Sequence, residues 1–502
     1  MRFAYSTLLL LATVVAPLAT ARAQTALTPE QALARAARSN QSLRAAMSDL
    51  RVARLSVQSA QDARTPVLVA GVDGSYNERF SGTSAGVART SDQQLGANVG
   101  VSYTTAIGTS LAAGIDTGVT WRQVNRDPTT TDTFGIPPTY TSQATVSARQ
   151  PLLRGAGTDS ILAELRQARA GLDQASYTRD DQASQLIRDV LSAYWELWYA
   201  EQSLAVQAQS LETAERQLAD ARMRSELGTA PRTDMLRFSA QLASIRESQA
   251  AAEISRQTRA LALGSLLGLP SESAAGLAAG VPPPEPGPEP PLSELVRMAR
   301  VASPEMLALA ASVQAARERV TSASDASLPR LDLTTSLGLA GVWNGADMLP
   351  GLQLPGGRPA FVGLVGLELE LPLGSSAADA DLARSRAQLD AAQQRFEARA
   401  LAVETSVATL RRSLDAAAAR VALATESASI ANQLAEAERQ RLALGTSTTA
   451  DLVLAQQSER ESALARLRAL VDQQATALEL DDASGRLLPR YARTFAQEAR
   501  PR

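Results

Sequence analysis

The chain has 502 residues, of which 20% are charged and 45% hydrophobic, and its formal net charge is −3. It contains neither Cys nor His, so disulfides are excluded and zinc, haem and iron–sulfur sites lack their usual ligands. Ser-His and Cys-His nucleophile pairs are excluded as well, and the near-neutral charge does not favour nucleic acid as a partner. An enzyme that works with carboxylates remains open.

The first 23 residues have the pattern of a secretory signal peptide. Arg2 provides a positive start, an apolar stretch covers 8–15, and Ala21-Arg22-Ala23 is an A-x-A cleavage site. Without Cys there is no site for an N-terminal lipid, and no later run of 18 apolar residues predicts a transmembrane helix. We therefore expect a periplasmic protein, a secreted protein or an outer-membrane β-barrel.

The mature sequence is an internal duplication. Leu227-Gly228-Thr229 recurs as Leu444-Gly445-Thr446, and Asp234 recurs as Asp451, both at a constant offset of 217 residues. A Pro-rich segment separates the copies, as a stiff linker would. The predicted organisation is a signal peptide at 1–23, a first repeat at 24–280 (a helix, strands over 66–151 and a helical hairpin over 158–267), a Pro-rich linker at 281–291, a second repeat at 292–487 (a helix, strands over 329–373 and a helical hairpin over 377–484) and a C-terminal tail at 488–502.

Each repeat carries a heptad pattern in its helical part. The positions of the second repeat are Leu382, Leu389, Phe396, Val403 and Leu410, with a complementary seam at Ala400, Val407, Leu414, Val421, Ala428, Ala435 and Leu442. The first repeat shows Leu197, Leu204, Leu211 and Leu218. Such seams predict coiled-coil packing, although an antiparallel bundle has the same pattern. A helix over 158–226 would be about 100 Å long at ~1.5 Å per residue.

Glycines mark where these long helices reverse. Gly228 and Gly445 occupy the position after a helix end, and Pro231 suits the first turn of the returning helix. The two hairpins are therefore predicted to have equivalent tips.

The strand segments alternate between apolar and polar or small residues. Phe361, Val365 and Leu367 alternate with Val362, Gly366 and Glu368, and aromatic residues lie near the predicted strand ends. Runs of about ten residues with this pattern are typical of outer-membrane strands, but a soluble sandwich shows the same alternation. The first repeat also has two additional strand-like runs, at 94–104 and 109–123.

Taken together, these features resemble the TolC-type outer-membrane efflux protein family over residues 28–487. The residues that carry the resemblance are Ser39-Asn40-x-x-Leu43, Ser303-Pro304-x-x-Leu307, Gln150-Pro151-Leu152-Leu153-Arg154-Gly155 and the Leu-Gly-Thr…Asp turns at 227–234 and 444–451. The resemblance implies an α+β membrane protein, a trimeric outer-membrane β-barrel continued by a long periplasmic α-helical coiled-coil barrel. The family has four strands per subunit, so the two additional runs imply an added hairpin or an enlarged barrel.

The resemblance also implies transport without chemistry, with no catalytic residue, cofactor or metal. The protein would be a homotrimer in outer-membrane lipid, extending into the periplasm as the exit duct of a tripartite efflux or type I secretion system. A periplasmic adaptor and an inner-membrane pump would be its partners. Multidrug efflux is one such role, and the sequence does not distinguish drugs, metal ions and proteins as cargo.

Residues at the hairpin tips are the candidate sites of this duct. By the resemblance, Asp234 and Asp451 belong to a periplasmic gate, although the first turn of any helix favours an acidic residue. Gly228, Thr229, Gly445 and Thr446 would form the tip turns and contact the adaptor.

Two departures from the family pattern concern the gate. Ser447 and Leu454 replace an Arg and an Asp of the family, so the bonds that close the gate must differ, with Arg232, Arg439 and Arg441 as candidate partners. In the barrel, Glu368 and Glu370 are expected to face the lumen.

Two other functional classes remain. A periplasmic coiled-coil adaptor would have one hairpin flanked by small β-domains, whereas this chain has two hairpins with amphipathic strands. An exported enzyme that uses paired carboxylates would need a compact pocket, whereas most of this chain follows heptads.

Overall fold

A computed structural model describes residues 26–83, 86–125, 133–229, 231–344, 360–374 and 376–498. The predicted signal peptide lies outside this part of the chain. The described residues form two compact units, which we call the helical unit and the sheet unit and describe separately. No helix among the described residues is both long enough and apolar enough to cross a membrane.

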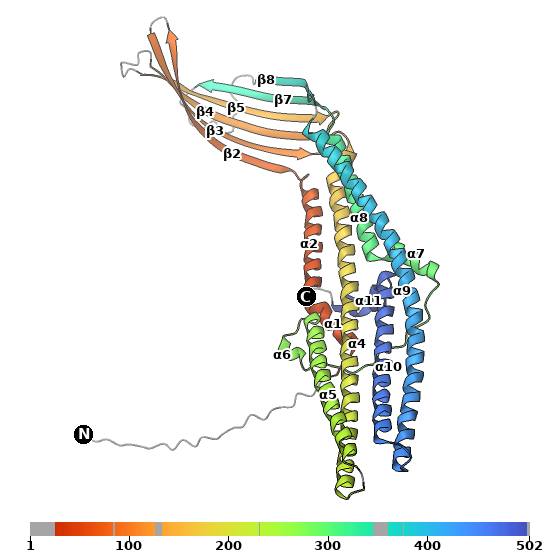
Figure 1. Cartoon of the computed structure of the whole chain (residues 1–502). Helices are drawn as coiled ribbons and strands as arrows, with labels where there is room; N and C mark the ends of the chain where they lie inside the picture. The colour runs from red at the N-terminus through yellow and green to blue at the C-terminus, as the bar shows by residue number, and fades with distance from the viewer. Residues whose placement is uncertain are drawn as a thin grey trace, which may run out of the picture. The chain divides into compact units, whose positions relative to one another are not determined.

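The helical unit contains the residues up to Gln41, Ala183–Leu292 and the residues from Val407. Its elements are β1 (Ala26–Leu27), α1 (Pro29–Ser39), α5 (Arg232–Leu266), α6 (Ser271–Ala274), β6 (Ala278–Ala279), α10 (Thr449–Ala483) and α11 (Leu487–Glu498), with the later parts of α4 (Ala163–Glu226) and α9 (Ala377–Ala443). Figure 1 labels its helices. The predicted hairpins are thus α4–α5 and α9–α10.

The heptad positions supply the core of the helical unit. Leu197, Leu218, Val407, Leu414 and Ala435 are all buried. In the first hairpin the α4 positions Ala214, Leu218 and Ala221 pack with Phe238, Leu242 and Ile245 of α5. Small Ala residues on one helix opposite large residues on the other allow close packing.

Two motif residues at the start of the first repeat, Ser39 and Asn40, have a structural role. The Ser39 hydroxyl donates to the Leu267 carbonyl oxygen (2.6 Å), and the Asn40 amide donates to that of Leu266 (3.2 Å). The last carbonyls of a helix have no partner within it. Ser39 and Asn40 therefore cap the C-terminal end of α5.

A two-stranded parallel ladder, β1–β6, is attached to the middle of α4. The Tyr194 hydroxyl donates to the Leu27 carbonyl oxygen (2.8 Å) and accepts from the Val281 amide (3.0 Å). The Glu201 carboxylate accepts from the Ala279 amide (3.1 Å). Burial raises the pKa of both Tyr194 and Glu201, and the hydrogen bonds from backbone amides oppose this shift.

The segment expected as a C-terminal tail contains the helix α11. Gly485, at a φ of 73°, ends α10 and allows the chain to turn. Leu487 is then buried, and Arg486 and Arg490 form ion pairs with the buried Asp481. The local sequence has no heptad pattern that would predict this helix. We therefore attribute the helix to the burial of Leu487 against other parts of the fold.

The sheet unit contains Ser42–Gln182 and Ser293–Ser406. Its strands are β2 (Val67–Thr83), β3 (Gly86–Thr104), β4 (Ser110–Asn125), β5 (Thr133–Pro151), β7 (Arg330–Asn344) and β8 (Ala360–Glu370). Its helices are α2 (Gln41–Asp62), α3 (Thr158–Ile161), α7 (Leu292–Ala302) and α8 (Pro304–Ala326), with the first parts of α4 and α9. The single helix expected from residue 158 is interrupted at Leu162, between α3 and α4.

All six strands form one antiparallel sheet in the order β2-β3-β4-β5-β7-β8 (Figure 1). The two additional strand-like runs of the first repeat are β3 and β4, and they lie inside the sheet. β5 of the first repeat pairs with β7 of the second over Thr139–Pro151 and Asp332–Asn344. The two repeats are therefore joined by strand pairing within one sheet.

Candidate functional site

The two hairpin tips have the same backbone geometry. After α4, the Thr229 amide donates to the Arg224 carbonyl oxygen (2.9 Å) and the Gly228 amide to that of Ser225 (3.1 Å). This pair of bonds, with Gly228 at a φ of 71°, is a Schellman motif. Glycine is required because other residues rarely adopt positive φ.

The second tip repeats this arrangement after α9. Gly445 has a φ of 76°, and the Thr446 amide donates to the Arg441 carbonyl oxygen (2.9 Å). The Thr446 hydroxyl donates to the same oxygen (3.1 Å), as the Thr229 hydroxyl does to that of Arg224. The residues before the glycines, Leu227 and Leu444, are 72% and 78% exposed. Each tip thus presents an apolar side chain to solvent beside a rigid turn.

Asp451 forms a capping box at the start of α10. The Asp451 amide donates to the Thr448 hydroxyl oxygen (3.2 Å), and the Thr448 amide donates to the Asp451 carboxylate (3.3 Å). The Thr448 hydroxyl also donates to that carboxylate (2.7 Å). Hydrogen bonds from the side chain and backbone of Thr448 lower the pKa of Asp451, so the carboxylate stays charged to more acidic pH than usual.

Asp234 instead connects the two hairpins. Its carboxylate accepts a hydrogen bond from the Thr449 hydroxyl at the start of α10 (2.9 Å). One heptad further along, the Gln241 amide donates to the amide oxygen of Gln456 (3.2 Å). The two predicted gate residues therefore have different partners, and α5 and α10 are joined by two polar contacts.

Two of the three arginines named as candidate gate partners, Arg439 and Arg441, form ion pairs within their own hairpin. Arg441 pairs with the buried Glu438, and the Ser447 hydroxyl donates to the same carboxylate. Arg439 pairs with Glu436 and Glu459. Ser447, which replaces an arginine of the family pattern, thus closes a local network around Glu438.

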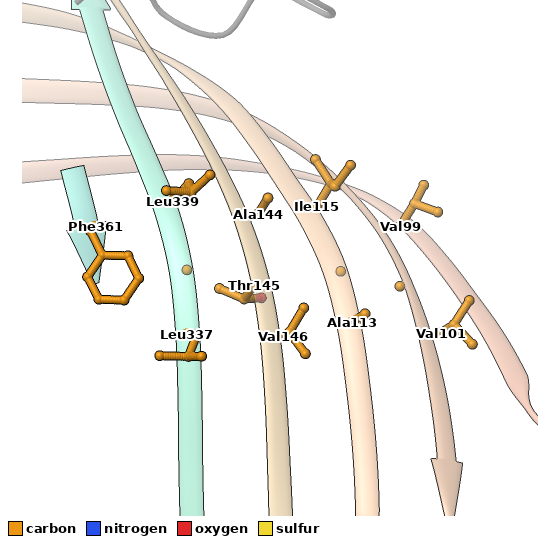
Figure 2. A pocket seen from close by; sticks show the side chains of 13 residues that line it. Val99, Val101, Ala113, Ile115, Ala144, Thr145, Val146, Leu337, Leu339 and Phe361 are labelled. Carbon is orange, nitrogen blue, oxygen red and sulfur yellow. The ribbon is translucent and has the colours of Figure 1, made fainter. Parts of the chain in front are cut away.

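One face of the sheet is apolar and uncovered by other described residues. Residues directly opposite in an antiparallel sheet share a face, and the register aligns Val99, Ile115, Ala144, Leu339 and Phe361 in one row. Figure 2 shows these side chains across the neighbouring strands, lining a shallow hollow. Val72 and Val365, also on this face, are each 77% exposed.

The height of this apolar face matches a membrane. Trp121 of β4 is opposite Gln93, which is opposite Tyr76, so both aromatic residues lie at one level. Leu111, opposite Tyr103 at the other end, is ten positions from Trp121. Ten residues span ~33 Å along a strand, or about 25 Å of membrane thickness at the usual barrel tilt.

The opposite face is polar. Asn98, Asp116 and Gln143 are neighbours in register, and Asp332 and Glu368 are opposite each other near the strand end. Glu368 and Glu370 lie on this polar face, and both are close to Arg330, with nitrogen–oxygen distances of 3.9 Å and 3.2 Å.

Several residues of the candidate site were not identified from the sequence. Thr449, Glu438 and the Gln241–Gln456 pair depend on contacts between helices, which a single heptad pattern does not reveal. Asp73 and Asp116 of the polar face could have been found from strand alternation. Among the described residues, no group of three or more Asp or Glu side chains could hold a metal ion.

Comparisons with known proteins agree with this architecture. The model of the family described as outer membrane efflux protein matches residues 32–269 and 295–486. Protein CyaE of Bordetella pertussis is 32% identical over 173 residues, which is 34% of this chain and 36% of that protein. The chain therefore aligns with about a third of the length of this curated relative.

Solved outer-membrane channels share the fold. The CmeC channel of Campylobacter jejuni superposes with a TM-score of 0.68 at 13% identity, covering 93% of this chain and 89% of that one. VceC of Vibrio cholerae gives a TM-score of 0.66 at 16% identity, covering 91% and 96%. The α+β fold, the recognised family and the outer-membrane location predicted from the sequence are confirmed. The chain belongs to the outer membrane efflux protein family, whose members are outer-membrane channels that extend into the periplasm.

Proposed function

We propose that this chain assembles as a homotrimer into the outer-membrane exit duct of a tripartite efflux or type I secretion system. Family channels are homotrimers that work with an adaptor and an inner-membrane pump. The six-stranded sheet carries the proposal, because its apolar face is exposed and its opposite face is polar. A closed barrel is the way for strands to cross a bilayer without unpaired edges.

Transport in this duct needs no chemical step by the chain itself. The family and fold are those of channel proteins, so the residues at the tips and on the polar face would bind, exclude or admit cargo. A duct of this kind differs from an enzyme that works with carboxylates, the alternative that the composition left open. It also differs from an adaptor, because the chain has a sheet with an exposed apolar face.

The hairpin tips are the proposed adaptor contact. Gly228 and Gly445 hold the two turns in equivalent conformations, and Thr229 and Thr446 lock them through bonds to helix carbonyls. The exposed Leu227 and Leu444 would provide the apolar contact area.

Asp234 and Asp451 are the proposed periplasmic gate. Asp234 links the hairpins through Thr449, whereas Asp451 presents a charged carboxylate at the start of α10. Three copies of each would place six carboxylates at the tips of the trimer. We propose that they constrict the entrance and attract cations.

The assembly is tested by fractionation and mass. Outer membranes are sedimented and mildly solubilised, and the native particle is weighed. A particle of three mature chains, found only in the outer membrane, supports the duct. A soluble monomer in the periplasm contradicts it and favours the adaptor.

The gate is tested with Asp451→Ala in planar bilayers. Removing three carboxylates and the helix cap is expected to raise the conductance at least severalfold and to weaken block by multivalent cations. Asp379→Ala is the matched control, because Asp379 forms the same kind of capping box with Ser376 at the start of α9. Unchanged conductance and block in Asp451→Ala would remove Asp451 from the gate.

A further inference from the structure

The hairpin β3–β4 is part of the wall of the sheet. β2 pairs with β3 in unbroken register from Val67 to Thr83, and β3 pairs with β4 from Arg89 to Thr104. Among the described residues β2 and β5 are not paired with each other. The hairpin therefore cannot lie outside a barrel without opening the wall between β2 and β5.

The inserted strands β3 and β4 each have one apolar and one polar face, as the other strands of the sheet do. Val99 of β3 and Ile115 of β4 are on the exposed apolar face, and both are more than half exposed. Asn98 and Asp116, one position away on each strand, are on the polar face. Trp121 lies on the apolar face at the level of Tyr76. Both strands thus fit a bilayer on one side and water on the other.

The turn between β3 and β4 is attached where the sheet continues into helices. Gly108 has a φ of 90°, and a Cβ added there would lie 2.2 Å from the Gly155 carbonyl oxygen. The Gly157 amide donates to the Ile107 carbonyl oxygen (3.3 Å), and the Thr109 hydroxyl donates to Gln150. The hairpin is thus integrated at this end of the sheet.

We propose that three copies of this chain close an eighteen-stranded barrel whose pore admits hydrophilic cargo of polypeptide size. The proposal depends on the homotrimeric duct proposed above. Its new interface pairs the edge strand β2 of one copy with β8 of the next, because these edges are unpaired among the described residues. With strands ~4.8 Å apart and tilted by about 40°, eighteen strands give a backbone diameter of roughly 36 Å and twelve strands roughly 24 Å.

The polar face keeps this pore wide. The Asp73 side chain lies over Gly96 of the neighbouring strand, and the Asn98 side chain lies over Gly71, each within 2.7 Å of an added Cβ. Larger residues at these glycines would push both side chains toward the pore axis. The barrel therefore imposes little size selection, and the helical part of the duct must provide it.

The pore width is tested with single cysteines, which are unique because the chain has no native Cys. Ser336 of β7 is on the polar face and Leu337 on the apolar face. In intact cells, a maleimide polymer of roughly 12 Å radius, too large for twelve strands but not for eighteen, is expected to label Ser336→Cys from outside. Leu337→Cys should remain unlabelled.

A variant lacking Gly86–Asn125 provides the comparison with twelve strands. It should still allow a small impermeant thiol reagent to label Ser336→Cys but exclude the large polymer. If this variant does not assemble, the full chain gives a second readout. Asn98→Cys and Asp116→Cys should react with the small reagent, whereas Val99→Cys and Ile115→Cys should not.

Three results are decisive. Exclusion of the large polymer from the full chain, or equal reactivity on both faces of β3 and β4, overturns the eighteen-stranded barrel. In that case labelling of Ser336→Cys by the small reagent leaves the proposed duct intact. Failure of even the small reagent to reach Ser336→Cys contradicts the duct itself.

Discussion

At the scale of single residues, the tip glycines determine where each hairpin turns. Gly228 and Gly445 have positive φ, yet an added Cβ would have no heavy atom within 4 Å at either position. The cost of a substitution there would come from the backbone conformation alone and not from a steric clash. This makes the two positions a clean measure of what the turn geometry contributes.

We predict that Gly228→Ala and Gly445→Ala each destabilise their tip by about 1 kcal/mol. Hydrogen–deuterium exchange of the tip amides should become roughly fivefold faster, while the overall melting temperature changes little. Gly171→Ala is the control, because that helical glycine also has open space but no positive φ. Equal tip exchange in all three variants would contradict the role of the turn.

Some contacts of single residues could be predicted from the sequence, and others could not. Gly228 and Gly445 were predictable because a helix end and the residue after it are adjacent in the chain. The hydrogen bond from Thr449 to Asp234 was not, since it joins residues of different repeats. Ser447 was predicted only to change the bonds that close the gate, and its hydrogen bond to Glu438 depends on the fold, which brings the two residues together.

At the scale of elements, α5 and α10 are joined by polar contacts one heptad apart. Gln456 is only 8% exposed, and its amide nitrogen has no hydrogen-bond partner among the described residues. The amide oxygen of Gln241 likewise has none there. A partly buried polar pair of this kind stabilises weakly but favours one alignment of two helices.

We predict that Gln456→Leu destabilises the α5–α10 pair by about 1–3 kcal/mol, because the partly buried Gln241 amide loses its partner. Exchange of amides in 232–266 and 449–483 should accelerate about tenfold. Adding Gln241→Leu should restore most of the protection, since no polar group is then left unpaired.

Gln457→Leu is the control on the neighbouring, exposed position of α10. It should leave exchange in both helices unchanged. A loss of protection in Gln456→Leu that Gln241→Leu does not repair would mean that the pair acts through packing rather than through its hydrogen bond.

Elements were predictable where their periodicity is local. The heptads at 382–442, within the hairpin predicted over 377–484, lie in α9 (Ala377–Ala443), and glycine or proline lies at several helix ends. The position of β3 and β4 within the sheet was open, because alternation shows which residues share a face but not which strand lies next to which. The helix α11 was missed, since only tertiary contacts bury Leu487.

At the scale of the whole molecule, apolar side chains remain exposed on a single copy. Leu423 and Ile430 of α9, one heptad apart, are 66% and 58% exposed. Exposed apolar rows on a coiled-coil helix mark an interface with another helix. In a homotrimer this face would contact the next subunit.

We predict that Leu423→Asp prevents trimer assembly, because an unpaired carboxylate would be buried in the interface. Light scattering of the solubilised protein should then show monomers. Ser429→Asp, at an exposed polar position about 120° around the same helix from Leu423, should remain trimeric. Trimers of Leu423→Asp with normal stability would place the interface elsewhere.

The segment at 281–291 has a consequence for how this gene could be divided. The Val281 amide donates a hydrogen bond to the Tyr194 hydroxyl in the first repeat. Glu289 forms an ion pair with Arg486 in the second repeat. Between these two anchors the chain contains neither helix nor strand, while β5 and β7 join the repeats across the sheet. A split gene with its break between the anchors would encode two polypeptides that each retain their own end of the segment. Such fragments are expected to complement each other when coexpressed. Six half-length chains would then form the duct that three full-length chains form.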